Sequence, residues 1–141
     1  MTQGPGQHPS PDANGGVGPN GRFVYPDSTP DERTFALLMH LSVLGQWVIP
    51  PFAIIAPIVM WQMKKDESPF IDEHGREVVN FQISLLLYAA VFFVLGFVTC
   101  GVAFGLVALV YVLGLVGMIL GAIASNRGES FRYPMTLRFL N

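Results

Sequence analysis

VVNFQISLLLYAAVFFVLGFVTCGVAFGLVALVYVLGLVGMILGAIASN, residues 78–126, decides the fold class, because it runs for 49 residues without a charged side chain. A single helix of that length would extend about 73 Å, more than twice the roughly 30 Å of a bilayer's hydrocarbon core. We therefore predict two membrane-spanning helices, at about 80–99 and 104–125, joined by a tight turn. A second charge-free window covers residues 34–63, and all 8 basic and 10 acidic residues lie outside the two windows.

The composition supports a membrane protein and excludes several other classes. Hydrophobic residues make up 51% of the 141 residues and charged residues only 13%, against roughly 25% charged residues in a typical soluble protein. No run of basic residues is long enough to predict a nucleic-acid partner. The single cysteine, Cys100, excludes an intrachain disulfide and a multi-cysteine metal site. We expect neither a cofactor nor a bound metal.

The two ends of the chain differ from its apolar middle. Residues 1–30 are rich in glycine and proline and cannot bury enough apolar surface to offset the entropy of ordering, so they predict a disordered tail. The membrane helical domain is expected at 31–126. Residues 127–141 form a cytoplasmic tail with aromatic residues and arginines, and we expect this tail to rest on the membrane surface.

Two adjacent prolines interrupt the first apolar window. Pro50 and Pro51 remove two backbone donors and push Ile49 away from the helical region. We therefore predict a break between two short helical segments, at about 34–47 and 51–64. These segments would form a thin hairpin or a re-entrant pair. The alternative is one kinked span.

The basic residues discriminate between these topologies. They fall into three groups, and none lies near the turn at 100–104. A hairpin at 34–63 would place all three groups on one side of the membrane, as the positive-inside rule requires. We therefore expect a multi-pass protein of the bacterial inner (cell) membrane with both termini in the cytoplasm. The groups are Arg22 and Arg33; Lys64, Lys65 and Arg76; and Arg127, Arg132 and Arg138.

Residues 69–80 have the pattern of an amphipathic helix. Apolar residues repeat at helical spacing, while charged residues take the opposite face. Ser68 and Pro69 are start signals for this helix. We predict that it lies along the cytoplasmic surface of the membrane and runs on into the third span.

Five polar side chains are candidates for function or for helix packing. His40 lies inside an apolar window, where it could relay protons or, as a neutral histidine, bond a neighbour. His74 has no second histidine at metal-binding spacing, so we expect it to orient its helix by hydrogen bonding. Asn80 and Gln82 enter the third span, where buried amides join helices. The fifth candidate is Gln46, beside the proline break.

Two pairs of glycines are spaced four residues apart: Gly101 with Gly105, and Gly117 with Gly121. Such spacing lets helices approach closely in lipid, either within one chain or between copies. Catalytic patterns are missing from the sequence, which has no nucleophile–base series, phosphate loop or dinucleotide fingerprint. We therefore do not expect an enzyme.

Several short motifs resemble a known family. Together they are similar to small bacterial membrane proteins related to the four-helix channel subunit of the chloroplast Tic protein-import translocon. The resemblance covers about residues 31–126 and implies a membrane domain of four helical segments. The motifs are His40-Leu41-Ser42, Gly45, Pro50-Pro51, Pro57, Trp61, Lys64-Lys65, Ser68-Pro69-Phe70-Ile71, His74-Gly75 and Asn80-Phe81-Gln82-Ile83-Ser84.

These patterns lead to two hypotheses for function. The first is a non-enzymatic membrane protein that assembles with itself or with other membrane proteins, with a translocon-like role implied by the resemblance alone. The alternative is a small oligomeric transporter or channel that uses His40, Asn80 and Gln82. A polar cavity around these three residues would favour transport, whereas burial against neighbouring helices would favour assembly.

Overall fold

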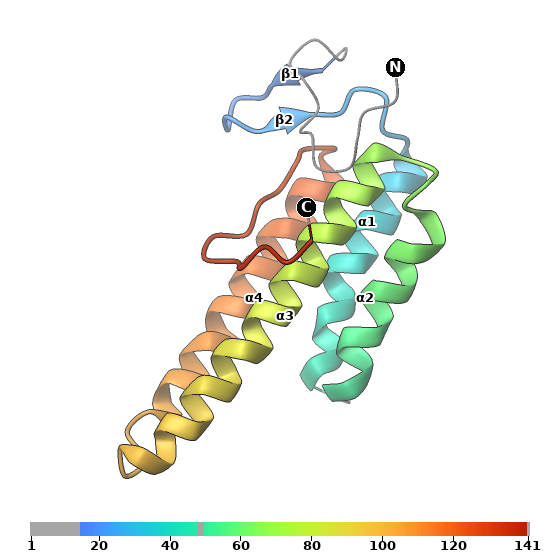
Figure 1. The fold of residues 1–141 in the computed structure, drawn as a ribbon. Coiled ribbons are helices and arrows are strands. Elements are labelled where there is room, and N and C mark those ends of the chain that lie inside the picture. The colour runs from blue at the N-terminus through green and yellow to red at the C-terminus, as the bar shows by residue number, and fades with distance from the viewer. Residues whose placement is uncertain (1–14, 48–49, 141) are drawn as a thin grey trace.

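The computed structural model describes residues 15–47 and 50–140 and is mainly helical, as predicted (Figure 1). Two long helices form one hairpin, and two shorter helices form a second hairpin packed against its upper half. A small β-hairpin lies over the end of the bundle. The elements are β1 (Gly16–Val17), β2 (Phe23–Val24), α1 (Pro30–Ser42), the 3-10 helix η1 (Val43–Trp47), α2 (Pro50–Lys64), α3 (Pro69–Val98) and α4 (Phe104–Asn126).

A capping box starts α1 ahead of the apolar segment predicted at about 34–47. The Thr29 hydroxyl accepts a hydrogen bond from the Glu32 backbone N–H at 3.2 Å, and the Glu32 carboxylate accepts one from the Thr29 N–H at 2.7 Å. Pro30 takes the first helical position, where its missing donor costs nothing. The helix therefore begins at Pro30 and includes one turn before the apolar segment.

The predicted helix break is present, and α1 and α2 form a hairpin (Figure 1). The α-helix ends at Ser42, η1 carries the chain on, and α2 begins at Pro50. A proline is tolerated at that position because the backbone N–H group that it lacks would have no partner within the helix in the first turn. The side chains of Gln46, Pro50 and Pro51 lie outside the described part of the structure.

The α3–α4 hairpin is much longer than the α1–α2 hairpin (Figure 1). Both α3, with 30 residues, and α4, with 23, are long and apolar enough to cross a membrane. Cys100 and Gly101 take positive φ values of 51° and 98° in the turn between them. A glycine suits this turn because it has no Cβ to clash at positive φ. Gly101 is thus a turn residue, whereas a Cβ added at Gly105 would meet no atom within 4 Å.

The amphipathic helix predicted at 69–80 is the first part of α3, which runs on from it without a break as expected. Its apolar residues Phe70, Ile71 and Val78 are buried in a cluster with Ala36 and Met39 of α1. The stripe faces the bundle because the α1–α2 hairpin offers it an apolar partner. The apolar stripe therefore turns toward the bundle, and the position of residues 69–80 along a membrane surface stays a prediction.

The segments at both ends are more ordered than predicted. Residues 15–29 contain the β1–β2 hairpin, whose Val24 also bridges to Glu129, so this part of the expected disordered tail has structure. Residues 1–14 lie outside the described part. After α4 the chain folds back over the bundle, and Phe131 and Tyr133 join a core cluster with Phe81. Aromatic side chains explain both differences, because their burial offsets the entropy of ordering.

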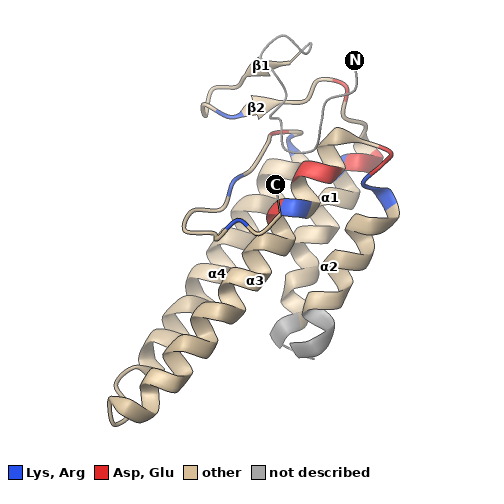
Figure 2. Cartoon of the chain, viewed as in Figure 1, with Lys and Arg blue, Asp and Glu red and all other residues tan. Residues whose placement is uncertain are grey.

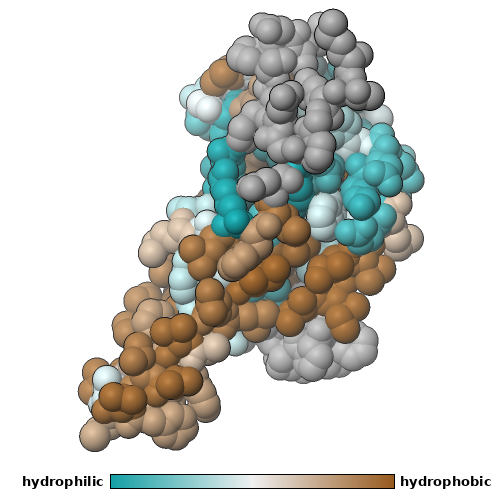
Figure 3. All heavy atoms as spheres, in the orientation of Figure 1, coloured by the Kyte–Doolittle hydropathy of each residue, from teal (hydrophilic) through white to brown (hydrophobic). Residues whose placement is uncertain are grey.

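Charged and apolar side chains are separated along the molecule. The described Lys, Arg, Asp and Glu residues gather at the end that carries β1 and β2 (Figure 2). Hydrophobic residues cover the far part of the α3–α4 hairpin (Figure 3). Large apolar side chains there, such as Phe97, Val98 and Val102, are exposed. A surface of this kind is stable in lipid and unfavourable in water.

Candidate functional site

A buried chain of hydrogen bonds joins three parts of the fold. His40 on α1 and His74 on α3 are both 0% exposed. His40 Nδ1 lies 2.5 Å from the Tyr133 hydroxyl, and His40 Nε2 lies 3.0 Å from His74 Nδ1. His74 Nε2 lies 3.1 Å from the backbone carbonyl oxygen of Glu129. We call these four groups the histidine chain.

The carbonyl group at one end fixes the direction of every bond in the histidine chain. A carbonyl oxygen only accepts, so His74 Nε2 carries a proton and donates it to Glu129. In a neutral imidazole the other nitrogen is an acceptor, so His74 Nδ1 accepts from His40 Nε2. His40 Nδ1 is then also an acceptor, and Tyr133 donates its hydroxyl proton to it. All ring nitrogens are satisfied while both histidines remain neutral.

Gly121 on α4 makes room for the histidine chain. A Cβ at this position would lie 2.5 Å from His40 Nδ1 and 2.8 Å from the Tyr133 hydroxyl oxygen. One turn earlier, a Cβ at Gly117 would lie 3.1 Å from Phe81 Cζ and 3.2 Å from Tyr133 Cδ1. The predicted small-residue face of α4 is therefore used for packing within the chain.

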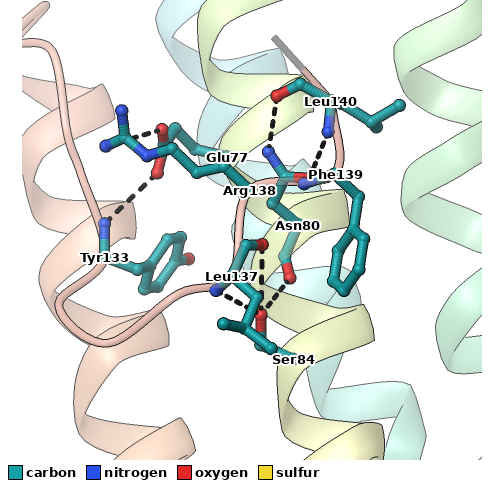
Figure 4. A network of polar contacts seen from close by, with 8 residues as sticks. All are labelled: Glu77, Asn80, Ser84, Tyr133, Leu137, Arg138, Phe139 and Leu140. Carbon is teal, nitrogen blue, oxygen red and sulfur yellow. Dashed lines mark hydrogen bonds and ion pairs between the residues drawn. The ribbon is translucent and has the colours of Figure 1, made fainter.

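Two carboxyl groups of α3 hold the segments at the charged end. The Tyr25 hydroxyl donates a hydrogen bond to Glu73, which joins the stretch after β2 to α3. Glu77 accepts a bond from the Tyr133 N–H at 3.3 Å and pairs with Arg138 at 3.8 Å (Figure 4). Burial, and after it the nearby carboxyl groups, raise the pKa of both tyrosines above the usual value of about 10.

A row of polar side chains on α3 holds the segment after α4 by its main chain. Asn80 Oδ1 accepts from the N–H groups of Phe139 and Leu140 at 3.0 and 2.9 Å, and Asn80 Nδ2 donates to the Leu140 carbonyl at 2.9 Å (Figure 4). The Leu137 N–H donates to the Ser84 hydroxyl at 2.9 Å. The Tyr88 hydroxyl donates to the Met135 carbonyl at 2.7 Å. We call Asn80, Ser84 and Tyr88 the α3 row.

The structure thus groups the predicted polar residues into two sites. His40 and His74 meet in the histidine chain, whereas Asn80 belongs to the α3 row. Gln82 lies on α3 and is buried, with only 1% of its surface exposed. Of the glycines, Gly121 belongs to the histidine chain's surroundings, whereas Gly101 and Gly105 lie far along the α3–α4 hairpin.

Four residues of these sites were missed in the sequence. Tyr133 and Glu129 lie in the segment for which the sequence predicts a surface tail, and Glu129 contributes only its main chain to the histidine chain. Ser84 and Tyr88 continue the spacing of four residues from Asn80, and that spacing in an apolar span is the signal that could have indicated a polar helix face.

Both the histidine chain and the α3 row form hydrogen bonds to another part of the same polypeptide, the segment after α4. Within the described residues, no three His, Cys, Asp or Glu side chains come together where they could hold a metal ion. The histidine chain could pass a proton between its members, because each one donates to the next. Its main observed effect is to tie α1, α3 and the segment after α4 together.

Comparisons with known proteins give one relationship. The family model described as the magnetosome magnetite crystal formation protein family (MamF/MmsF) matches residues 31–140, from α1 to the segment after α4. No curated protein and no solved structure matches the chain. The resemblance to the chloroplast translocon subunit therefore finds no support in these comparisons.

Proposed function

Because the chain belongs to the magnetosome magnetite crystal formation protein family, we propose that it is a membrane-embedded, non-enzymatic component of magnetite crystal formation. The observation that carries the proposal is the family match over residues 31–140, and the separation of charged and apolar surfaces supports it (Figures 2 and 3). An apolar hairpin anchors the chain in a membrane, while the charged end meets water.

The hydrocarbon core of the membrane would cover the apolar part of the α3–α4 hairpin. The core would begin beyond Tyr88 on α3, because the main chain of residues 135–140 lies along the helix between Asn80 and Tyr88 and an irregular segment exposed to lipid is costly. The α1–α2 hairpin stops short of the α3–α4 turn (Figure 1) and would enter the membrane only in part.

The charged end would face the cytoplasm. One group of basic residues precedes the first apolar window, one lies between the two windows and one follows the second, whereas the α3–α4 turn carries none. The positive-inside rule then places both termini in the cytoplasm. On intact crystal-containing vesicles isolated from cells that carry the chain, a membrane-impermeant thiol reagent should label Asp66→Cys but should label Val102→Cys only after the membrane is permeabilised, each in a Cys100→Ser background. Labelling of Val102→Cys alone in intact vesicles would reverse the orientation.

The buried polar residues favour an assembly role over transport. A transport site needs polar groups that line a path for the substrate. His40 and Asn80 are instead buried and bonded to other parts of the same chain. The chain would act as a membrane scaffold of the crystal-forming compartment, alone or with other membrane proteins.

Deletion of the gene in the magnetite-forming bacterium that carries it tests the proposal. Electron microscopy should show crystals of altered size or number, and the wild-type gene should restore them. A tagged copy should fractionate with the membrane that surrounds the crystals. Unchanged crystals in the deletion strain, or recovery of the tagged copy in the soluble fraction, would contradict the proposal.

A further inference from the structure

The α3 row binds a polypeptide main chain with little regard for its side chains. Each of its contacts to residues 135–140 is to a backbone N–H or C=O group. Any segment that presents the same backbone could therefore make the same bonds. The site is thus suited to a peptide, and residues 135–140 occupy it in this structure.

The spacing of the row fits an extended chain. Four residues of α-helix rise about 6 Å, and two residues of extended chain advance about 6.6 Å. Going down the helix from Tyr88 to Ser84 to Asn80, the contacts move from Met135 to Leu137 to Phe139 and Leu140. Each step of four helical residues therefore meets about every second residue of the segment.

A strained turn precedes the part of the segment that the row holds. Met135 has a φ of 61°, a left-handed conformation that is unfavourable for a residue with a side chain. It is 81% exposed, so no packing compensates for this strain. Before the turn, Phe131 and Tyr133 are buried in the core. The chain is thus fixed up to Tyr133 and reverses at a strained, exposed hinge.

Side chains supply only part of the attachment of the segment to its own copy. Leu137 is 40% exposed and Phe139 is 54% exposed. Thr136 and Leu140 are half-buried, and Arg138 pairs with Glu77, a contact that a second copy would also offer. The main-chain bonds to the α3 row therefore supply much of the attachment, and an identical row on a second copy would supply the same bonds.

We propose that residues 136–140 exchange between two copies of this chain. The segment of one copy opens at Met135 and binds the α3 row of the second copy, which returns its own segment. All bonds are remade, and the left-handed strain at Met135 is released. A second copy is the partner because 135–140 is the sequence that is seen to fit the row. Exchange does not depend on a role in crystal formation.

Cross-linking between two tagged copies tests the exchange. One copy carries Ser84→Cys and the other Leu137→Cys, both in a Cys100→Ser background, and they are co-expressed in one membrane. A short thiol-to-thiol linker can join these positions, because the Ser84 Oγ and the Leu137 nitrogen are 2.9 Å apart. A chain with both substitutions serves as the positive control. Val112→Cys replaces Leu137→Cys in the matched control for simple proximity, since Val112 is exposed on α4.

We expect a mixed-tag product with Leu137→Cys well above that with Val112→Cys. Met135→Gly should lower the product several-fold, because glycine accepts the closed turn without strain. Met135→Pro should raise it, because proline cannot adopt a positive φ. Mixed-tag product no higher than the Val112→Cys control, while the doubly substituted chain cross-links internally, would overturn the proposal. So would equal yields from the two Met135 variants.

Discussion

The hydroxyl group of Tyr133 donates a hydrogen bond to Nδ1 of His40, which lies 93 positions earlier in the sequence. Through His74 the same chain of bonds ends at the carbonyl of Glu129. The two ends of the histidine chain, Tyr133 and Glu129, thus lie in the segment after α4. Its two middle members, His40 and His74, join α1 to α3. The α1–α2 hairpin is held against the longer hairpin partly by this buried connection.

Tyr133→Phe should lower the stability of the folded protein. The substitution keeps the ring but removes the donor, so His40 Nδ1 is left buried without a partner. An unsatisfied buried acceptor costs about 1–3 kcal/mol. Chemical unfolding in mild detergent, followed by circular dichroism, would measure the loss. Tyr88→Phe is the matched control, because it loses an exposed bond to Met135 and should cost less. Equal stabilities of wild type and Tyr133→Phe would contradict this prediction.

Gly121→Ala and Gly105→Ala should have effects of opposite sign. A methyl group at position 121 would lie 2.5 Å from His40 Nδ1, so the histidine chain would have to move. At position 105 there is open space, and alanine favours a helix over glycine by up to about 1 kcal/mol. Thermal melting of both variants in the same detergent is the measurement. If Gly121→Ala melts at or above the wild-type temperature, the close approach of α4 to His40 is not required.

The helical architecture could be predicted because it follows from local chemistry. The uncharged stretch at 78–126 is too long for one span, and Pro50 cannot continue the helix that precedes it. The α3–α4 hairpin follows from the first fact, whereas the positions of the basic residues were needed to prefer the α1–α2 hairpin over one kinked span. The α1 helix begins upstream of the apolar segment expected at about 34–47, because the capping box of Thr29 with Glu32 fixes its first turn.

The two sites could not be predicted because they depend on contacts between distant residues. His40 and Asn80 were identified as costly polar residues in apolar segments, but nothing local indicates their partners. Tyr133 lies in a segment whose alternating arginines and aromatic residues also suit a membrane surface. Its burial depends on the space above Gly121, and that space exists only when α1, α3 and α4 are packed together.

Asn80→Ala should release residues 139 and 140 without unfolding the helices. The substitution removes the acceptor of two backbone N–H groups and the donor to the Leu140 carbonyl. Each lost bond is expected to cost roughly 1 kcal/mol. Amide hydrogen exchange at Phe139 and Leu140 should become faster, while exchange within α3 stays slow as an internal control. Asn80→Asp keeps the acceptor and should retain part of the protection. Unchanged exchange in Asn80→Ala would show that the row does not hold this segment.

Alkaline pH should destabilise the protein partly through Tyr133. Burial and then Glu77 raise the pKa of Tyr133 in the folded state well above the value of about 10 that it has when unfolded. The unfolded state therefore loses this proton first. The contribution of neutral Tyr133 to stability is complete below about pH 10 and declines as the pH rises above it, by about 1.4 kcal/mol per pH unit. Tyr25, whose pKa is raised by burial and then by Glu73, acts in the same direction.

The slope of the free energy of unfolding against pH separates the ionisation of Tyr133 from the loss of its hydrogen bond to His40. Above about pH 10 the free energy of unfolding of Tyr133→Phe should fall less steeply than that of the wild type, because one ionisation no longer accompanies unfolding. Denaturant unfolding in detergent at a series of alkaline pH values gives both slopes. Phenolate absorbance recorded in the same samples should show Tyr133 ionising together with unfolding. Parallel slopes for the two proteins would mean that Tyr133 already ionises in the folded state and is not enclosed with His40.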